Sequence, residues 1–150
     1  MNYHLAQLNI AQLLAPIDSP QLKDFVDNLE RINTLAEQFE GFVWRLQTEE
    51  GDATALRPFG EEVIVNLSVW ASVEALHQFV YRSAHTPIMS RRREWFARMT
   101  NTYMVLWWIP QGHEPSVEEA KQRLDLLQTQ GASAQAFSFK QVFEQPSKAF

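Results

Sequence analysis

The sequence of 150 residues contains no cysteine, which excludes disulfide bonds, thiolate metal sites and a cysteine nucleophile. Only five glycines occur and none of them cluster, so the glycine-rich loops that cradle phosphates or dinucleotides are missing. The G-x-S-x-G sequence of a serine nucleophile is also missing. Hydrolase, kinase and nicotinamide-dependent oxidoreductase functions therefore have no support in this sequence.

Long apolar runs and long basic stripes are also missing. The longest apolar run, over 104–109, is far shorter than the roughly 18 residues that a membrane-spanning helix needs. Residues 1–4 show no basic patch followed by an apolar run, so we expect no signal peptide. The net charge is −5 and the only dense basic cluster is Arg91–Arg93, which disfavours a nucleic-acid partner. We expect a cytoplasmic protein with neither a membrane nor a nucleic-acid partner.

Hydrophobic periodicity predicts one α+β domain over 1–150, with its core within about 3–139 and a polar tail. Alternating apolar residues predict strands over 3–10, 42–48, 62–70, 102–109 and 134–139. Three-to-four apolar spacing with capping residues predicts helices over 20–40, 73–84, 87–99 and 117–130. The order β-α-β-β-α-β is the split βαβ arrangement, so we predict a ferredoxin-like antiparallel sheet with helices on one face.

The two faces of this sheet differ in chemistry. The aliphatic face, which we expect beneath the helices, carries Ala6, Leu8, Ile10, Val63, Val65, Leu67 and Val69. The mixed face carries Gln7, Asn9, Ile64, Asn66, Ser68 and Trp70. Asparagine is disfavoured in the middle of a strand, so the mixed face needs an explanation. A second subunit covers it, or it lines a ligand site with a few placed polar groups, or both.

The five tryptophans are candidates for the wall of that site, although each can equally be core or interface. Trp107 and Trp108 are adjacent in a predicted strand and therefore point to opposite faces. Tyr103 shares a face with Trp107, and we expect this pair to line the pocket. The further substrate-binding candidates are Gln7, Trp44, Ser68, Trp70 and Trp95.

His85 is the titratable residue of most interest, because it stands at a predicted helix break just before Thr86 and Pro87. A histidine there can serve as a general base, a proton shuttle or a haem ligand. The alternative is a structural histidine that fixes the helix junction through hydrogen bonds. His4 and His77 are not at metal-ligand spacing, so we expect no metal site.

Several short sequences resemble, in order, a bacterial family classed as a domain of unknown function. They are LAQLN at 5–9, GFVWRL at 41–46, FVY at 79–81 with His85, WF at 95–96, and VLWW at 105–108 through GH at 112–113. That family looks related to the dimeric α+β barrel superfamily, which includes antibiotic-biosynthesis monooxygenases and haem-degrading enzymes. The resemblance implies a homodimer whose two sheets close into a barrel, with a small-molecule pocket in each subunit. Shared fold does not imply shared chemistry.

Three hypotheses for function remain open. In a cofactor-independent monooxygenase acting on an aromatic substrate, His85 takes a proton and Asn9 or Asn66 holds the oxyanion. The resemblance implies such roles for Asn9, Asn66, Trp70 and His85 by residue type alone. One alternative is a non-enzymatic dimeric ligand-binding or interaction protein. The other is a haem-binding protein with His85 as the axial ligand. Apart from haem in that alternative, we expect no cofactor.

Overall fold

The computed structural model describes residues 2–47, 56–82, 90–99 and 101–146, and these residues form one layered α+β unit. Its strands are β1 (Tyr3–Gln12), β2 (Phe42–Arg45), β3 (Val63–Trp70) and β4 (Met104–Pro110). Its helices are α1 (Lys23–Gln38), α2 (Val73–Arg82) and α4 (Val117–Gln130), with short 3-10 turns η1 (Pro20–Leu22) and η2 (Arg92–Glu94). None of the helices in this part of the chain is both long and apolar enough to cross a membrane.

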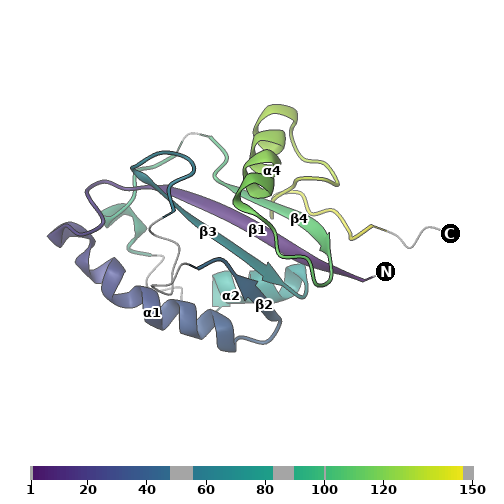
Figure 1. The fold of residues 1–150 in the computed structure, drawn as a ribbon, viewed down its shortest axis with the longest axis horizontal. Helices are drawn as coiled ribbons and strands as arrows, with labels where there is room; N and C mark the ends of the chain where they lie inside the picture. The colour runs from purple at the N-terminus through teal and green to yellow at the C-terminus, as the bar shows by residue number, and fades with distance from the viewer. Residues whose placement is uncertain (1, 48–55, 83–89, 100, 147–150) are drawn as a thin grey trace.

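The strands form one antiparallel sheet in the order β2-β3-β1-β4 (Figure 1). The long strand β1 lies between β3 and β4 and pairs with both, over 5–12 with β3 and over 3–9 with β4. This strand order and the helix placement are those of the ferredoxin-like fold, so the predicted fold class is confirmed. The closure of two such sheets into a dimeric barrel stays a prediction.

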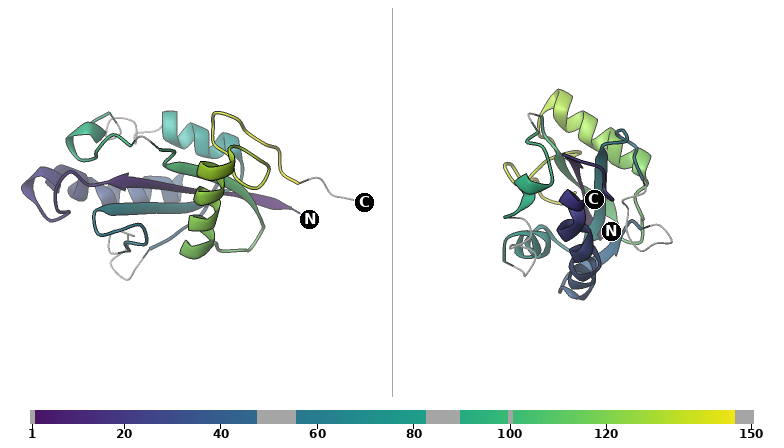
Figure 2. Two further views of the ribbon diagram at one scale, coloured as in Figure 1. Left: turned by 90° about the horizontal axis from the view of Figure 1, so that it is seen from above. Right: turned by 90° about the vertical axis from the view of Figure 1, so that its left-hand side faces the viewer.

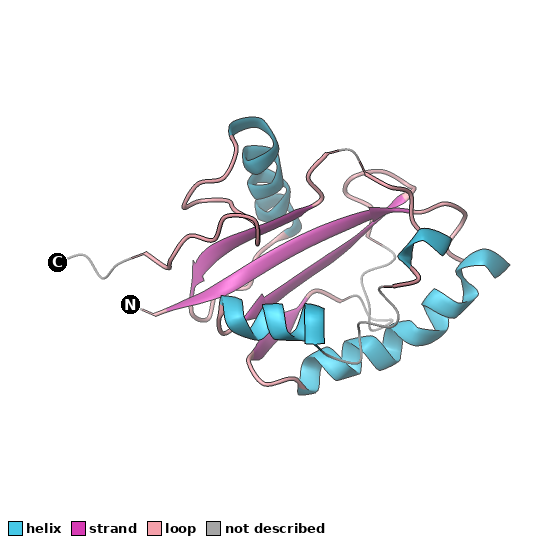
Figure 3. Ribbon diagram, turned by 180° about the vertical axis from the view of Figure 1, so that it is seen from behind, coloured by secondary structure: helices cyan, strands magenta, loops and turns pink. Residues whose placement is uncertain are grey.

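The assignment of the two sheet faces differs from the sequence prediction. Helices α1 and α2 cover the mixed face, whereas the aliphatic face is covered by α4 (Figures 2 and 3). Strand alternation separates two faces but does not say which helix covers which. The crossover helices carry large aromatic side chains, and these pack at the two ends of the mixed face, where apolar residues meet them. The flatter, β-branched aliphatic face instead accommodates the leucines of α4.

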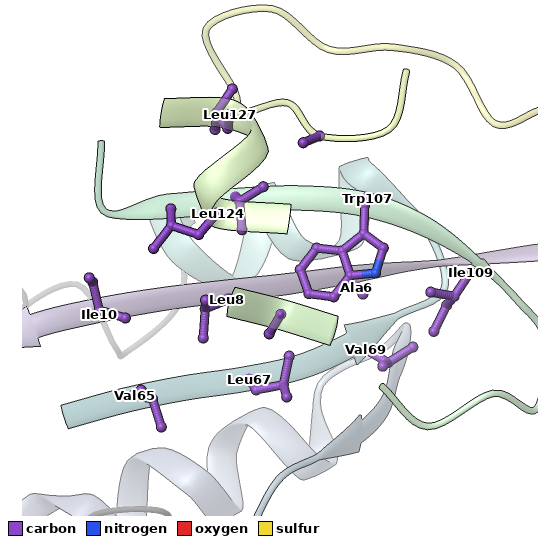
Figure 4. Packing of buried hydrophobic residues seen from close by; sticks show 13 residues of the cluster. Ala6, Leu8, Ile10, Val65, Leu67, Val69, Trp107, Ile109, Leu124 and Leu127 are labelled. Atoms are coloured by element: carbon purple, nitrogen blue, oxygen red, sulfur yellow. The ribbon is translucent and has the colours of Figure 1, made fainter. Parts of the chain in front are cut away.

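The aliphatic face forms a tightly packed core with α4 (Figure 4). Leu124 and Leu127 of α4 belong to the same buried cluster as Leu8 and Trp107, and the Trp107 side chain is fully buried. The gap that remains between this face and Phe59 is too narrow to admit a water molecule. The face therefore has no room for a ligand in this part of the core.

The face beneath α1 and α2 carries two separate aromatic clusters, one toward each end of the sheet. The Trp70 cluster joins Trp70 to Phe39, Phe42 and Phe79, with ring centroids 5.1–6.3 Å from the Trp70 ring. The Trp95 cluster comprises Leu13, Leu22, Ile64, Trp95 and Phe96, with Phe25 packed against it. Each cluster is a local core, so the middle of this face lies between two apolar ends.

Two predicted elements are not formed as expected. In the described part of the predicted helix over 87–99, only η2 is helical, because the following residues pair with the end of β1: Leu14 N donates to Trp95 O and Ala97 N to Gln12 O, both at 2.9 Å. The predicted last strand is reduced to a bridge in which Phe137 exchanges two hydrogen bonds with Leu106. In the first segment, backbone pairing with the end of β1 outweighs local periodicity.

Candidate functional site

A row of polar side chains crosses the sheet beneath α1 and α2, between the two aromatic clusters. Gln7 and Asn9 of β1 face Ser68 and Asn66 of β3 as direct cross-strand neighbours. These four residues are called the polar row below. Gln7 is 2% exposed and Ser68 6% exposed, whereas Asn66 is exposed although it lies in the middle of its strand. The row is therefore buried at one end and reaches solvent at Asn66.

Hydrogen bonds fix the orientation of the amides in the polar row. Gln7 Nε2 lies 2.5 Å from Asn66 Oδ1, 2.8 Å from Ser68 Oγ and 3.3 Å from the Asn66 backbone oxygen. Gln7 Oε1 accepts from Asn9 Nδ2 at 3.0 Å. If the Gln7 amide were reversed, its oxygen would face the two Asn66 oxygens and its NH₂ group would face the Asn9 NH₂ group, so the observed orientation is the better satisfied one. Gln7 therefore holds the Asn66 oxygen inward and turns the Asn66 NH₂ group away from itself.

Two hydrogen-bond donors of the row remain available. Ser68 Oγ accepts from Gln7 Nε2 at 2.8 Å and from Trp70 Nε1 at 2.9 Å, so both of its lone pairs are used. Its hydroxyl proton and the Asn66 NH₂ group meet no acceptor among the residues that the structure describes. The row thus presents uncharged donors, and a group that complements it is an acceptor such as a carbonyl, phenolate or carboxylate oxygen.

Arg45 adds a positive charge to this face, and the sequence analysis missed it. Arg45 is the cross-strand neighbour of Ser68, and its Nε lies 3.4 Å from Glu37 Oε2 of α1. A β-bulge between Phe42 and Trp44 reverses the alternation, so that Arg45, and not Trp44, faces the helices. Strict alternation from Phe42 gives the opposite result, and the sequence carries no clear signal for this bulge.

The structure brings together only part of the predicted site. Gln7, Asn9, Asn66, Ser68 and Trp70 lie side by side on one face. Trp95 lies on the same side of the sheet but within the second aromatic cluster. His85 lies outside the described residues.

The predicted pocket wall of Tyr103 and Trp107 is wrong. Both side chains pack on the aliphatic face together with Trp44, opposite the polar row. The reason is the register of β4 against β1, in which Trp107 stands opposite Ala6 and therefore shares its face. Tyr103 instead stacks beneath Arg92, whose Cζ lies 5.1 Å from the ring centroid.

Trp107 is held by a carboxylate at the start of α4. Trp107 Nε1 donates to Glu119 Oε2 at 2.9 Å, and His113 Nε2 donates to Glu119 Oε1 at 2.6 Å. Partial burial by itself raises the pKa of Glu119, but the hydrogen bonds from His113 and Trp107, with the charges of His113 and Arg123, bring the pKa below its usual value. The ionised carboxylate therefore stabilises the folded state.

Replacing Glu119 by alanine should destabilise the protein at neutral pH. The fully buried Trp107 N–H would lose its acceptor, and we expect the free energy of unfolding to fall by about 1–3 kcal/mol at pH 7. The pKa of Glu119 is lowered on folding, so this contribution is complete above its unfolded pKa of about 4.3 and is lost as the pH falls through the folded value. Urea unfolding of the variant and the parent from pH 7 to pH 3 measures this difference.

Glu118→Ala is the matched control, because Glu118 occupies the same helix turn and is exposed. It should change stability by only about 0.5 kcal/mol. Equal losses in the two variants, or a difference that does not vary with pH, would show that Glu119 acts only through the helix dipole.

Neither a metal-ligand cluster nor the open groove found in the described part of the chain lies at the polar row. Among the described residues, no three or more His, Asp or Glu side chains lie together so as to hold a metal ion. An open groove of about 480 Å³ runs along α4 near Arg123 and Asp125, on the side of the sheet away from the polar row. The polar row is therefore the place where buried, oriented polar groups meet solvent.

Comparison with known proteins gives one family and two structural neighbours. The model of a family described as a domain of unknown function, DUF3291, matches residues 4–150. The solved structure of NE2512, a protein of unknown function from Nitrosomonas europaea, is 13% identical, with a TM-score of 0.50, and covers 76% of this chain and 96% of its own. SnoaB, a cofactor-independent oxygenase from Streptomyces nogalater, is 16% identical, with a TM-score of 0.48, and covers 74% of this chain and 96% of its own. A search of curated proteins gives no match.

Proposed function

Because the family match spans nearly the whole sequence, the chain belongs to the DUF3291 family, and we propose that it binds a small aromatic molecule through an acceptor oxygen placed against Asn66 and Ser68. The observation that carries this proposal is the pair of oriented, unused donors in the polar row. Gln7 is fully engaged in holding them, at 2% exposure, so the donors are positioned before a ligand arrives. Preorganised groups lose little conformational entropy on binding, which favours a binding role over a purely structural one.

The surroundings of the polar row support an aromatic ligand. The Trp70 cluster adjoins the row directly, because the indole of Trp70 donates to Ser68 Oγ. Stacked or edge-to-face aromatic pairs contribute about 0.5–1.5 kcal/mol beyond the burial of their area. Trp70 itself is buried, but Phe39 and Phe42 of this cluster are only partly buried, and a few placed polar groups beside such rings are the usual composition of a small-molecule site.

The same donors support a second candidate function, cofactor-independent oxygenation of an enolisable aromatic ketone. Fixed N–H and O–H donors in a dry setting stabilise an enolate oxygen. A base removes a proton from the ring methylene, and the carbanion passes electrons to O₂. The methylene becomes a carbonyl with one oxygen atom, and the other leaves as water. The base that the sequence predicts, His85, lies outside the described residues, so support for this function comes from the donors alone.

Replacing Asn66 by leucine should remove recognition of the acceptor while leaving the ring contacts in place. We expect the Kd for 2-naphthamide, measured by calorimetry or tryptophan fluorescence, to rise about tenfold, since an unpaired carbonyl on binding costs about 1–3 kcal/mol. The Kd for 2-methylnaphthalene, which has no acceptor, should stay the same.

The oxygenase function is tested in the same preparations by oxygen uptake with anthrone. Uptake above the buffer rate that is lost in Asn66→Leu would support this function.

Asn101→Leu is the matched control, because Asn101 is an exposed asparagine that precedes β4. This variant should bind 2-naphthamide as the parent does. If Asn66→Leu also binds it unchanged, or if the parent binds neither naphthalene compound, the polar row is not a binding site. Oxygen uptake equal to that of buffer would leave binding as the function.

A further inference from the structure

We propose that this site selects anionic ligands, with Arg45 receiving a carboxylate that also accepts from Ser68 or Asn66. The inference rests on the proposed function and adds the charge of the ligand to it. The Arg45 side chain is only 12% exposed, yet among the residues that the structure describes it makes no short contact with an acidic group.

Arg45 is held loosely for a buried cation. Its Nε lies 3.4 Å from Glu37 Oε2 and forms no hydrogen bond, and its Nη2 lies 3.4 Å from Gln47 Oε1. Arginine and carboxylate that pair well do so through two parallel bonds of about 2.7–2.9 Å. Only the long contact to Gln47 engages the guanidinium among the described residues, so most of the hydrogen-bonding capacity of Arg45 is available to water or to a ligand.

The position of Arg45 fits a ligand held by the polar row. Arg45 and Ser68 are direct cross-strand neighbours on the same face, where Cβ atoms stand about 4.5–5.5 Å apart. Asn66 is the diagonal neighbour, at about 7–8 Å. A carboxylate above Ser68 is therefore within reach of the guanidinium fork and of the free donors of Ser68 and Asn66.

Glu37 is the group that such a ligand would displace. Its side chain is 41% exposed and stands in the last turn of α1, whereas Arg45 is nearly buried. Water can solvate Glu37 when it turns away, but the buried guanidinium needs an anion. Glu37 therefore acts as a weak internal competitor for Arg45, and its removal should strengthen ligand binding.

The test compares 2-naphthoate with 2-naphthamide, which share a ring and differ in the charge of one group. We expect the parent protein to bind the carboxylate roughly tenfold more tightly than the amide. Arg45→Gln should abolish this preference. Glu37→Gln should increase it several-fold, and this variant keeps the test sharp if Arg45→Gln folds poorly, because Glu37 lies at the rim.

Two neighbouring residues on α1 supply controls for net charge. Arg31→Gln and Glu30→Gln make the same charge changes at exposed positions, and both should retain the preference of the parent. If naphthoate and naphthamide bind equally, and Asn66→Leu weakens both, the binding site stands and the anion preference is overturned. If the preference survives in Arg45→Gln or falls in Glu37→Gln, another cation selects the ligand. If Asn66→Leu affects neither compound, the proposed function fails, and the inference fails with it.

Discussion

Trp70→Ala should lower the free energy of unfolding by about 3–5 kcal/mol, the usual cost of removing a large buried aromatic side chain. Trp70 is 1% exposed and is the hub of its cluster, in contact with Phe39, Phe42 and Phe79. These rings come from the residue that follows α1, from β2 and from α2, so the cavity left by the substitution would loosen both helices from the sheet. Urea unfolding followed by circular dichroism measures the loss.

Trp70→Phe separates packing from hydrogen bonding. Phenylalanine keeps much of the ring contact but deletes the N–H that donates to Ser68 at 2.9 Å. We expect a smaller loss than for alanine, about 1–2 kcal/mol, from the lost bond and the reduced volume. A loss as large as that of Trp70→Ala would mean that the indole hydrogen bond, and not the aromatic packing, holds this end of the sheet.

Gly41→Ala should destabilise the protein by about 2–5 kcal/mol, for two separate reasons. Gly41 joins α1 to β2 with φ of +94°, a conformation that costs a residue with a side chain about 1–2 kcal/mol. A Cβ atom added there would also collide with the Cβ of Ala75 in α2. Relief requires α2 to shift as a body, which adds about 1–3 kcal/mol of overpacking. Thermal or urea unfolding measures the sum.

Gly112→Ala isolates the backbone part of this effect. Gly112 has nearly the same φ, +91°, but an added Cβ would meet nothing within 4 Å. It should therefore cost only the conformational part, about 1–2 kcal/mol. Adding Ala75→Gly to Gly41→Ala should relieve the collision. Equal losses at the two glycines, or no gain from the double substitution, would show that the approach of α2 to Gly41 does not limit stability.

The regular strands made much of the architecture predictable. Alternation along β1 and β3 is unbroken, so the residues that share the face of Asn66 follow directly from sequence spacing. The mid-strand asparagines were informative because propensity disfavours them, and one of them, Asn66, is where the polar row reaches solvent. Periodicity within each element was enough for this part of the site.

Other features depend on contacts that single-sequence patterns do not contain. Which face α1 and α2 cover is decided by where their aromatic side chains fit. The face of Tyr103 and Trp107 is decided by the register of β4 against β1, in which Trp107 stands opposite Ala6. Arg45 reaches the site through a bulge of one residue. The hydrogen bonds that turn the Asn66 amide outward come from Gln7, 59 positions away in the sequence.

The bulge in β2 also bears on how related chains should be compared. Phe42 and Val43 together stand opposite Trp70, so the strand carries one residue more than its partner at this point. A relative that lacks this extra residue would present a different side chain to the helices at the same distance along the strand. Column-by-column alignment would then equate residues on opposite faces of the sheet. To decide whether a relative keeps the positive charge of Arg45, one should first identify its residue that pairs with the equivalent of Ser68. The alignment should allow a gap at Val43.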